Sequence, residues 1–291
     1  MAALPHRQFL VTRSLLTAGR VELPFSPCSP GHFCFHTDMA AASLTRVVRY
    51  CDRLLDTGRF TDWEGAFNGL QVESRGAVTR IAAAVDARAA TVEMAIATQA
   101  DLLLVHHGLF WGPSQPWIGR RYRLLRRLLD HDLAVYSSHL PLDAHPRLGN
   151  NARLCAALGL KRLRPFFVEK GRFIGFKSRV RVDRRELVRR LCLAVGHEPI
   201  VLPGGPKTCR IIGVVTGAAG SQLRQAAGEG VDTFIIGEGP HWTHALAEDL
   251  GINVLYGGHY ATETFGVKAL AEHLARRFRL PWVFLDHPTG L

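Results

Sequence analysis

The chain has 291 residues and a formal net charge of +11, and 47% of its residues are hydrophobic. This composition excludes an intrinsically disordered protein, because such chains have too few apolar side chains to form a core. No apolar run reaches the roughly 18 residues that a membrane-spanning helix needs, so we expect a soluble protein without a membrane partner.

The positive charge raises the question of nucleic-acid binding. Arg far outnumbers Lys, as is typical of GC-rich genomes, and many basic residues gather between Lys161 and Arg190. A solvated basic face, or the attraction of a small anionic substrate, explains this tract as well as DNA does. We therefore expect a small anionic substrate, with nucleic acid as the weaker alternative.

Cysteine usage points to a reducing compartment. No two cysteines form a C-x-x-C pair, which argues against a disulfide scaffold and against a cysteine-type zinc site. Reduced thiols are typical of cytoplasmic proteins, so we expect a cytoplasmic location. The six cysteines are Cys28, Cys34, Cys51, Cys155, Cys192 and Cys209.

The first element in chain order is an N-terminal extension, residues 1–42. It lacks clear hydrophobic periodicity and contains several prolines, so we expect either a disordered extension or a mis-assigned start, with Met39 as the true first residue. From Ser43 the pattern changes at once, because apolar residues from Leu44 to Leu55 recur at helical spacing. Ser43 is the expected N-cap of this helix.

Apolar strands and amphipathic helices then alternate, which predicts an α/β fold. Asp183 and Glu186 form a capping-box pattern at the start of one helix. The predicted strands cover 81–85, 101–105, 133–137, 173–182, 210–215, 232–236, 252–256 and 282–285, and the predicted helices cover 91–99, 120–131, 151–158, 183–194, 222–229, 242–250 and 262–278.

The same order of motifs occurs twice, which indicates an internal duplication. In both halves a strand ends in a histidine that is followed four residues later by a carboxylate: His139 with Asp143, and His259 with Glu263. Because α/β folds place chemistry at strand ends, we expect two related lobes that share one site between them. The matching segments are 81–86 with 211–216, 101–108 with 232–239, and 135–139 with 255–259; the predicted lobes cover 43–166 and 167–263, and a C-terminal helix and strand (264–291) pack back on the first lobe.

His106 and His107 are adjacent, and Gly108 marks the end of their strand. Consecutive residues in a strand point to opposite faces, so both imidazoles can reach metals only at a strand end, where they serve two different metals more easily than one. The alternative is a pair of hydrogen-bonded core histidines.

The two histidine–carboxylate motifs complete the candidate ligand set. If a helix begins near Thr262, Glu263 lies in its first turn and can bridge two cations with its two oxygens; a helix-capping Glu beside a surface His is the alternative. Asp143 follows Pro141, which predicts a turn rather than a helix interior. His139 is either a ligand or a residue that orients Asp143.

This set of nitrogen and oxygen donors without sulfur suits zinc, iron, manganese or nickel. Two such ions about 3.5–4 Å apart would acidify a bridging water, and the resulting hydroxide, held by Glu263, would favour hydrolysis. Glu238 and His241 are candidates for proton transfer in the substrate pocket, with a plain tight turn as the alternative. The loop from Thr216 to Ser221 lacks the Lys of a P-loop, so a phosphate site there is the weaker interpretation.

The chain also resembles a known family, the Nif-three-like dinuclear metal-centre hexameric proteins, also labelled GTP cyclohydrolase I type 2-like. The resemblance runs from about Ser43 to Leu291. Its motifs occur in the family's order: Phe67-Asn68-Gly69-Leu70-Gln71-Val72-Glu73, His106-His107-Gly108-Leu109-Phe110-Trp111, the stretch from Ser138 to His145, Gly149-Asn150-Asn151, and the stretch from Gly258 to Glu263.

The resemblance implies two intertwined α/β lobes, a homohexamer, and two divalent ions per chain, with Glu263 bridging them. It favours a metal-dependent hydrolase of the cyclohydrolase or phosphoester type, acting on a nucleotide-like substrate. A non-catalytic metal-binding, metal-handling or scaffold protein is the alternative. The ligands that the resemblance implies are His106, His107, Asp143, His259 and Glu263.

Overall fold

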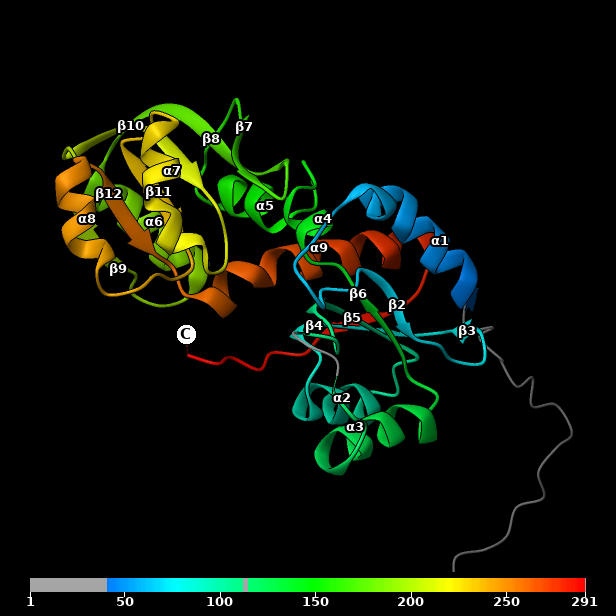
Figure 1. Cartoon of the computed structure of the whole chain (residues 1–291). Coiled ribbons are helices and arrows are strands. Elements are labelled where there is room, and N and C mark those ends of the chain that lie inside the picture. Colours follow the sequence, from blue (N-terminus) through cyan, green and yellow to red (C-terminus); the bar gives the residue numbers. More distant parts are fainter. Residues whose placement is uncertain (1–40, 112–114, 291) are drawn as a thin grey trace, which may run out of the picture. The chain divides into compact units, whose positions relative to one another are not determined.

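The structure, a computed structural model, describes residues 41–111 and 115–290 (Figure 1). The expectations for residues 1–40, the disordered extension and the start at Met39, lie outside these residues. All described residues fall within one compact unit. Two sheets with helices between their strands confirm the predicted α/β fold, while the predicted lobe boundaries stay a prediction.

The first sheet has five strands in the order β13-β4-β5-β6-β2. Strands β13, β4, β5 and β6 run parallel, and β2 pairs with β6 in the antiparallel sense. A short antiparallel pair, β1 with β3, lies outside this sheet. The strands are β1 (Ala42–Ser43), β2 (Gly69–Val72), β3 (Ala77–Val78), β4 (Ile81–Asp86), β5 (Leu102–His107), β6 (Ala134–Ser137) and β13 (Trp282–Phe284); the helices of this half are α1 (Leu44–Leu55), a 3-10 turn (Thr57–Arg59), α2 (Ala89–Ala97) and α3 (Gly119–Asp130).

The second sheet has six strands in the order β7-β8-β10-β11-β12-β9. Its parallel centre is β10-β11-β12, and β9 pairs antiparallel with β12. The strands are β7 (Arg164–Glu169), β8 (Arg172–Asp183), β9 (Ile200–Pro203), β10 (Thr208–Val214), β11 (Thr233–Ile236) and β12 (Asn253–Tyr256); the helices are α4 (Leu140–Asp143), α5 (Asn150–Ala157), α6 (Arg184–Val195), a 3-10 turn (Ala219–Gln222), α7 (Leu223–Gly228), α8 (Thr243–Leu250) and α9 (His259–Phe278).

The predicted duplication is visible in both sheets. Strands β4-β5-β6 and β10-β11-β12 have the same order and direction, and an antiparallel strand follows the third member in each. The likeness extends to single hydrogen bonds: the carboxylate of Asp101 accepts from the backbone N–H of Arg80, and that of Asp232 accepts from Arg210 and Ile211. Each aspartate thus fixes the start of the preceding parallel strand.

The parallel strands are buried on both faces, as their nearly continuous apolar sequences require. Because successive side chains point to opposite faces, Ile81 and Ala83 join the core beneath α1 and α9, whereas Ala82 and Ala84 join the core beneath α2 and α3. Side chains of the second sheet likewise alternate between two cores, one on each face. These two-sided cores fix the strand register, and therefore the position of each strand end.

Helix α9 connects the two halves. It starts directly after β12 of the second sheet, packs against α5, and buries Val267 and Leu274 in the core of the first sheet (Figure 1). Strand β13 then pairs with β4. The C-terminal end of the chain therefore completes the sheet that the N-terminal half begins.

Every helix and strand predicted above is present, with three differences. Helix α9 begins at His259 rather than near Thr262, because Gly258 with φ of 82° turns the chain directly into it. A four-residue helix, α4, replaces the turn expected at Asp143. The capping box at α6 is incomplete, because Asp183 accepts from Arg185 N–H whereas Glu186 pairs with Arg189 and Arg190.

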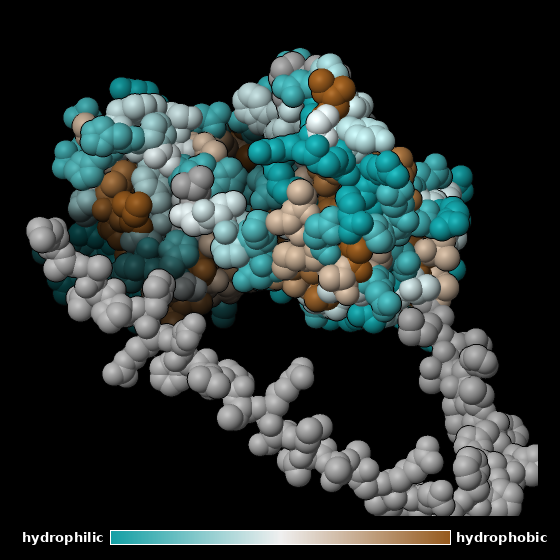
Figure 2. Space-filling model, turned by 90° about the horizontal axis from the view of Figure 1, so that it is seen from below, coloured by the Kyte–Doolittle hydropathy of each residue, from teal (hydrophilic) through white to brown (hydrophobic). Residues whose placement is uncertain are grey.

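None of the helices in residues 41–111 and 115–290 is both long and apolar enough to cross a bilayer. On the face shown in Figure 2, hydrophobic residues form separate patches among hydrophilic ones.

Candidate metal centre

The candidate site lies where the parallel strands of both sheets end. Strand β5 ends at His107, β6 is followed by His139, and β12 is followed by His259 at the start of α9. The carboxyl ends of parallel strands meet at one edge of a sheet, and here residues from both edges line one cavity. The structure therefore brings the two predicted histidine–carboxylate motifs together.

His106 and His107 are both close to Glu263. The Nε2 atom of His106 lies 3.6 Å from Glu263 Oε1, and Nε2 of His107 lies 3.3 Å from Glu263 Oε2. His106 is fully buried, whereas His107 lines the cavity. The Gln71 side chain packs against Gly108, where a Cβ would lie 2.2 Å from it, and accepts a hydrogen bond from Leu109 N–H.

His259 and Glu263 lie one turn apart on α9, so both side chains point from the same helix face. Their separation is 3.1 Å between His259 Nε2 and Glu263 Oε2. The Glu263 side chain is only 3% exposed, and Gly217 makes room for it: a Cβ at Gly217 would lie 2.3 Å from Oε1.

Asp143 approaches from α4 on the opposite side of His106, with its Oδ2 atom 3.6 Å from His106 Nε2. Its Oδ1 atom accepts hydrogen bonds from Asn150 Nδ2 at 2.9 Å and from Thr216 Oγ1 at 3.4 Å. Asn150 belongs to α5, and Thr216 follows β10. The carboxylate is thus held by α5 and by the segment that follows β10.

The histidines of the site share one arrangement. In each of them Nδ1 is hydrogen-bonded to an oxygen that can only accept, so Nδ1 carries the proton and Nε2 is left for the centre. Histidines that bind metals are oriented in this way. The pairs are His106 with the Ser138 carbonyl at 2.9 Å, His107 with Asp86 at 3.0 Å, His139 with Asp62 at 2.8 Å, and His259 with Glu238 at 2.8 Å.

The electrostatics of the site reflect carboxylates packed against imidazoles. Burial lowers the pKa of His106, but Asp143 and Glu263 outweigh burial and raise the pKa to about 10. For His259, burial is likewise outweighed by Glu263 and Glu238, and the pKa rises to about 9. Burial dominates at His107 and lowers its pKa. The pKa of Glu263 is held well below its usual value, although burial opposes this, by His107 and His106.

Two sets of donor atoms could hold metal ions among the described residues: His106, His107 and His139, and His107, His259 and Glu263. Within each set the ligand atoms lie within 4.8 Å of one another.

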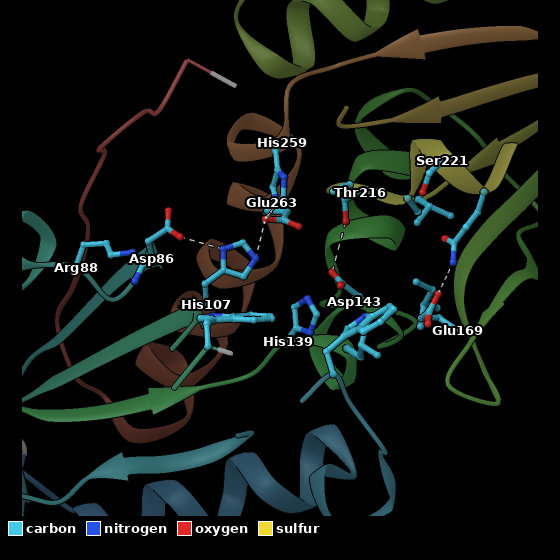
Figure 3. Close-up of a pocket in the computed structure, with 18 residues that line it drawn as sticks. Asp86, Arg88, His107, His139, Asp143, Glu169, Thr216, Ser221, His259 and Glu263 are labelled. Carbon is cyan, nitrogen blue, oxygen red and sulfur yellow. Dashed lines mark hydrogen bonds and ion pairs between the residues drawn. The ribbon is translucent and has the colours of Figure 1, made fainter. Parts of the chain in front are cut away.

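The cavity over these groups has a volume of about 510 Å³. Figure 3 shows His107, His259 and Glu263 facing one another, with Asp143 beside Thr216 and with Ser221 and Glu169 at the far side. The walls are mixed in character: Trp63, Trp111, Leu140, Ile174 and Val215 are apolar, and Arg88 adds a positive charge.

Glu238 and His241 are placed differently from the expectation. Glu238 is not among the residues that line this cavity; its carboxylate instead accepts from His259 Nδ1. His241 is exposed and does not line the cavity either. In the second half, the turn that corresponds to the His-His motif thus supplies Glu238, whose carboxylate orients His259.

Asp62 and Asp86 were not singled out from the sequence, and Asn150 and Asn151 were noted only as part of a family motif. Asp62 and Asp86 hold His139 and His107, and Asn150 and Asn151 connect the halves, with Asn151 Oδ1 accepting from Thr216 N–H at 2.7 Å. Asp86 lies at the end of a predicted strand, and this position is the only sequence feature that could have suggested its role beside His107. Asp62 lies in an irregular loop, where no periodicity marks it.

Comparison with known proteins agrees with this arrangement. The family model DUF34/NIF3 (NGG1p interacting factor 3) matches residues 42–289. The chain belongs to this family. It is 42% identical over 250 residues to the GTP cyclohydrolase 1 type 2 homolog of Halobacterium salinarum (84% of this chain, 97% of the relative), and 38% identical over 247 residues to the homolog of Deinococcus radiodurans (84% and 93%).

A solved structure of a protein from Thermus thermophilus superimposes with a TM-score of 0.80 at 40% identity, covering 86% of this chain and 100% of that one. The resemblance stated from the sequence motifs is therefore confirmed.

Proposed function

We propose that this protein binds two divalent metal ions in the shared cavity and uses them to hydrolyse a small anionic substrate. The proposed ligands are His106, His107, Asp143, His259 and Glu263, and the curated relatives named GTP cyclohydrolase 1 type 2 homolog support hydrolysis as the reaction class.

One observation carries the metal assignment. His106 Nε2 and Glu263 Oε2 are buried side-chain atoms without a hydrogen-bond partner among the described residues. An unpaired buried polar atom costs about 1–3 kcal/mol, and more when it is charged. Two such atoms in one centre, each beside further imidazole and carboxylate donors, fit cations better than they fit a packed core.

The donor chemistry fits as well. Imidazole and carboxylate groups without thiolate suit zinc, iron, manganese or nickel. Glu263 directs its two oxygens to different imidazoles, Oε1 to His106 and Oε2 to His107 and His259. This is the placement that a bridging carboxylate requires.

Bound metals would supply Lewis acidity and an activated water at neutral pH. The chain's own residues bind and orient the substrate. Arg88 lines the cavity together with Asp86, and its positive charge can attract an anionic substrate. Trp111, whose ring meets those of His107 and His139 edge-on at 5.3 and 4.9 Å, shields that side of the centre from water.

The cavity favours catalysis over metal storage. Its volume of about 510 Å³ lies within the range of small-molecule sites, and it opens directly over His107, His259 and Glu263. A storage or scaffold site needs no such cavity. Homohexamer formation and a cytoplasmic location remain part of the proposal, and they are independent of the chemistry.

The test is turnover by the metal-loaded protein against a panel of nucleotides and phosphoesters. We expect hydrolysis of at least one class that is lost in Glu263→Ala, because the carboxylate between the imidazoles is gone. Arg88→Gln should raise KM for the anionic substrate with metal content unchanged. Full metal loading without turnover of any compound would support the non-catalytic alternative.

A further inference from the structure

We propose that His139 is a further metal-binding residue, held in place by a clamp that consists of Asp62 and Asn68. The inference rests on the proposed function, since it concerns the same cavity, but it assigns a donor that the five proposed ligands do not include.

The side chain of His139 is oriented as the other site histidines are. Its Nδ1 atom donates to Asp62 Oδ1 at 2.8 Å, and no hydrogen bond of Nε2 to a described residue is found. The His139 ring lies 4.9 Å from that of His106 and 5.7 Å from that of His107. The donor atoms of the three imidazoles lie within 4.8 Å of one another, so His139 is close enough to share a cation with His106 or with His107.

The clamp fixes the backbone as well as the ring. Asn68 Oδ1 accepts from His139 N–H at 2.7 Å, and Asn68 Nδ2 donates to Asp62 Oδ2 at 2.8 Å. Asp62 Oδ2 also accepts from Leu140 N–H at 3.1 Å. This closed set of hydrogen bonds fixes the orientation of the imidazole. A metal ligand needs a fixed ring orientation, whereas a surface histidine does not.

The alternative role, in which His139 orients Asp143, has no hydrogen bond behind it among the described residues, although the His139 imidazole acts electrostatically on the Asp143 carboxylate. The hydrogen bonds found for the Asp143 carboxylate come from Asn150 and Thr216, and none comes from His139. The Asp143 carboxylate is therefore hydrogen-bonded without His139, whose side chain lines the cavity beside His107 (Figure 3).

The duplication supports the same assignment. His139 and His259 occupy matching positions, and each has its Nδ1 held by a carboxylate, Asp62 or Glu238.

The loop that carries Asp62 is itself held in place. Asp62 also accepts from Trp63 N–H at 2.7 Å, and the ammonium group of Lys170 lies 3.8 Å from the centre of the Trp63 ring. The β7–β8 turn of the second sheet thus steadies the loop that carries Asp62.

The experiment is a titration of the metal-free full-length protein with Co²⁺, followed by visible absorption and by metal content after dialysis. Wild type should bind about two ions per chain. His139→Ala should lose one binding step and change the cobalt spectrum. Asp62→Asn, which keeps the side-chain shape, should weaken one step by about 10–100-fold. His197→Ala, at an exposed histidine outside the cavity, is the matched control.

Unchanged stoichiometry and affinity in both His139→Ala and Asp62→Asn, with His107→Ala losing metal, would overturn the role of His139 and leave the proposed function standing. Absence of Co²⁺ binding by wild type would overturn both. Circular dichroism of the metal-free variants separates loss of a ligand from loss of folding: a variant that keeps the wild-type spectrum and loses one binding step supports the proposal.

Discussion

In the metal-free protein, the histidines of the centre differ in their pKa and therefore in their protonation. The pKa of His106 is raised to about 10 and that of His259 to about 9, after burial is outweighed by neighbouring carboxylates, whereas burial keeps the pKa of His107 low. Around neutral pH two imidazoles therefore carry protons where the proposed cations would bind. Protons and metal ions compete for the same nitrogen atoms.

This competition gives a prediction for pH. Metal binding should release protons, and affinity should rise as the pH is raised from the ordinary histidine pKa of 6.5 towards about 9, where His259 loses its proton. The sign follows because each raised pKa favours the protonated, metal-free state at low pH. Titration calorimetry in buffers of different ionisation enthalpy measures the released protons. An affinity that does not change with pH would contradict the prediction.

A second residue-scale prediction concerns Gly217. Its φ of +75° disfavours any side chain, and a Cβ would lie 2.3 Å from Glu263 Oε1. Gly217→Ala should therefore destabilise the protein by at least about 1–2 kcal/mol and lower its metal content, because Glu263 must move. Thermal unfolding and metal analysis measure both effects. Gly228→Ala, at a helical residue where a Cβ meets nothing within 4 Å, is the control; it should leave the metal content unchanged and should not lower the stability, because Ala is the better helix former.

At the scale of elements, α9 and α5 determine how the site is assembled. Helix α9 carries two donors at its first turns and buries Val267, Leu270 and Leu274 in the core of the first sheet. Asn150, at the start of α5, accepts from Gly266 N–H of α9 at 2.6 Å and donates to Asp143 at 2.9 Å. The buried amide of Asn150 thus links α9, the helix that carries Glu263, to the Asp143 carboxylate.

Asn150→Ala tests this link. Removing the amide leaves buried partners unsatisfied, so the free energy of unfolding should fall by about 1–3 kcal/mol, and metal affinity should fall because Asp143 is released. Urea unfolding of the metal-free protein measures the first effect. Gln225→Ala removes an exposed hydrogen bond to Val168 and should cost no more than about 0.5 kcal/mol. Equal losses in the two variants would contradict the role of Asn150.

At the scale of the whole molecule, the basic tract has local partners. Lys170 and Arg172 lie over aromatic rings, Lys177 pairs with Glu229, and the Arg184 guanidinium donates to Asn253. Cations engaged in this way are less available to a phosphate backbone. Nucleic acid stays the weaker alternative, and we expect any binding to be weak and to fall steeply with salt.

Self-association is the prediction that belongs to this scale. Large apolar side chains are exposed in both halves, among them Ile118 (72%) and Leu193 (71%). Exposed apolar patches mark interfaces when they are contiguous. We expect a particle of six chains of 32.2 kDa each, and sedimentation velocity measures its mass. A monomer at micromolar concentration would contradict the prediction.

The sequence by itself determined the α/β class, the order of the main helices and parallel strands, and the duplication, because burial on two faces imposes apolar runs and because the same motif order repeats in both halves. The five proposed ligands were implied by the family resemblance and stay a prediction, and strands β2, β7 and β9 were not predicted. The start of α9 was predicted three residues late, since the left-handed turn at Gly258 leaves no periodic signal.

Only the tertiary structure decided which groups hold those ligands. Asp62 reaches His139 across 77 positions, and Asn150 reaches Gly266 across 116. No local sequence pattern predicts the hydrogen-bond partner of Asp62 or of Asn150. The same holds for Glu238, which the sequence placed in a pocket and the fold places behind His259. Hydrogen bonds between distant segments depend on how the sheets pack, which the pattern along the chain does not encode.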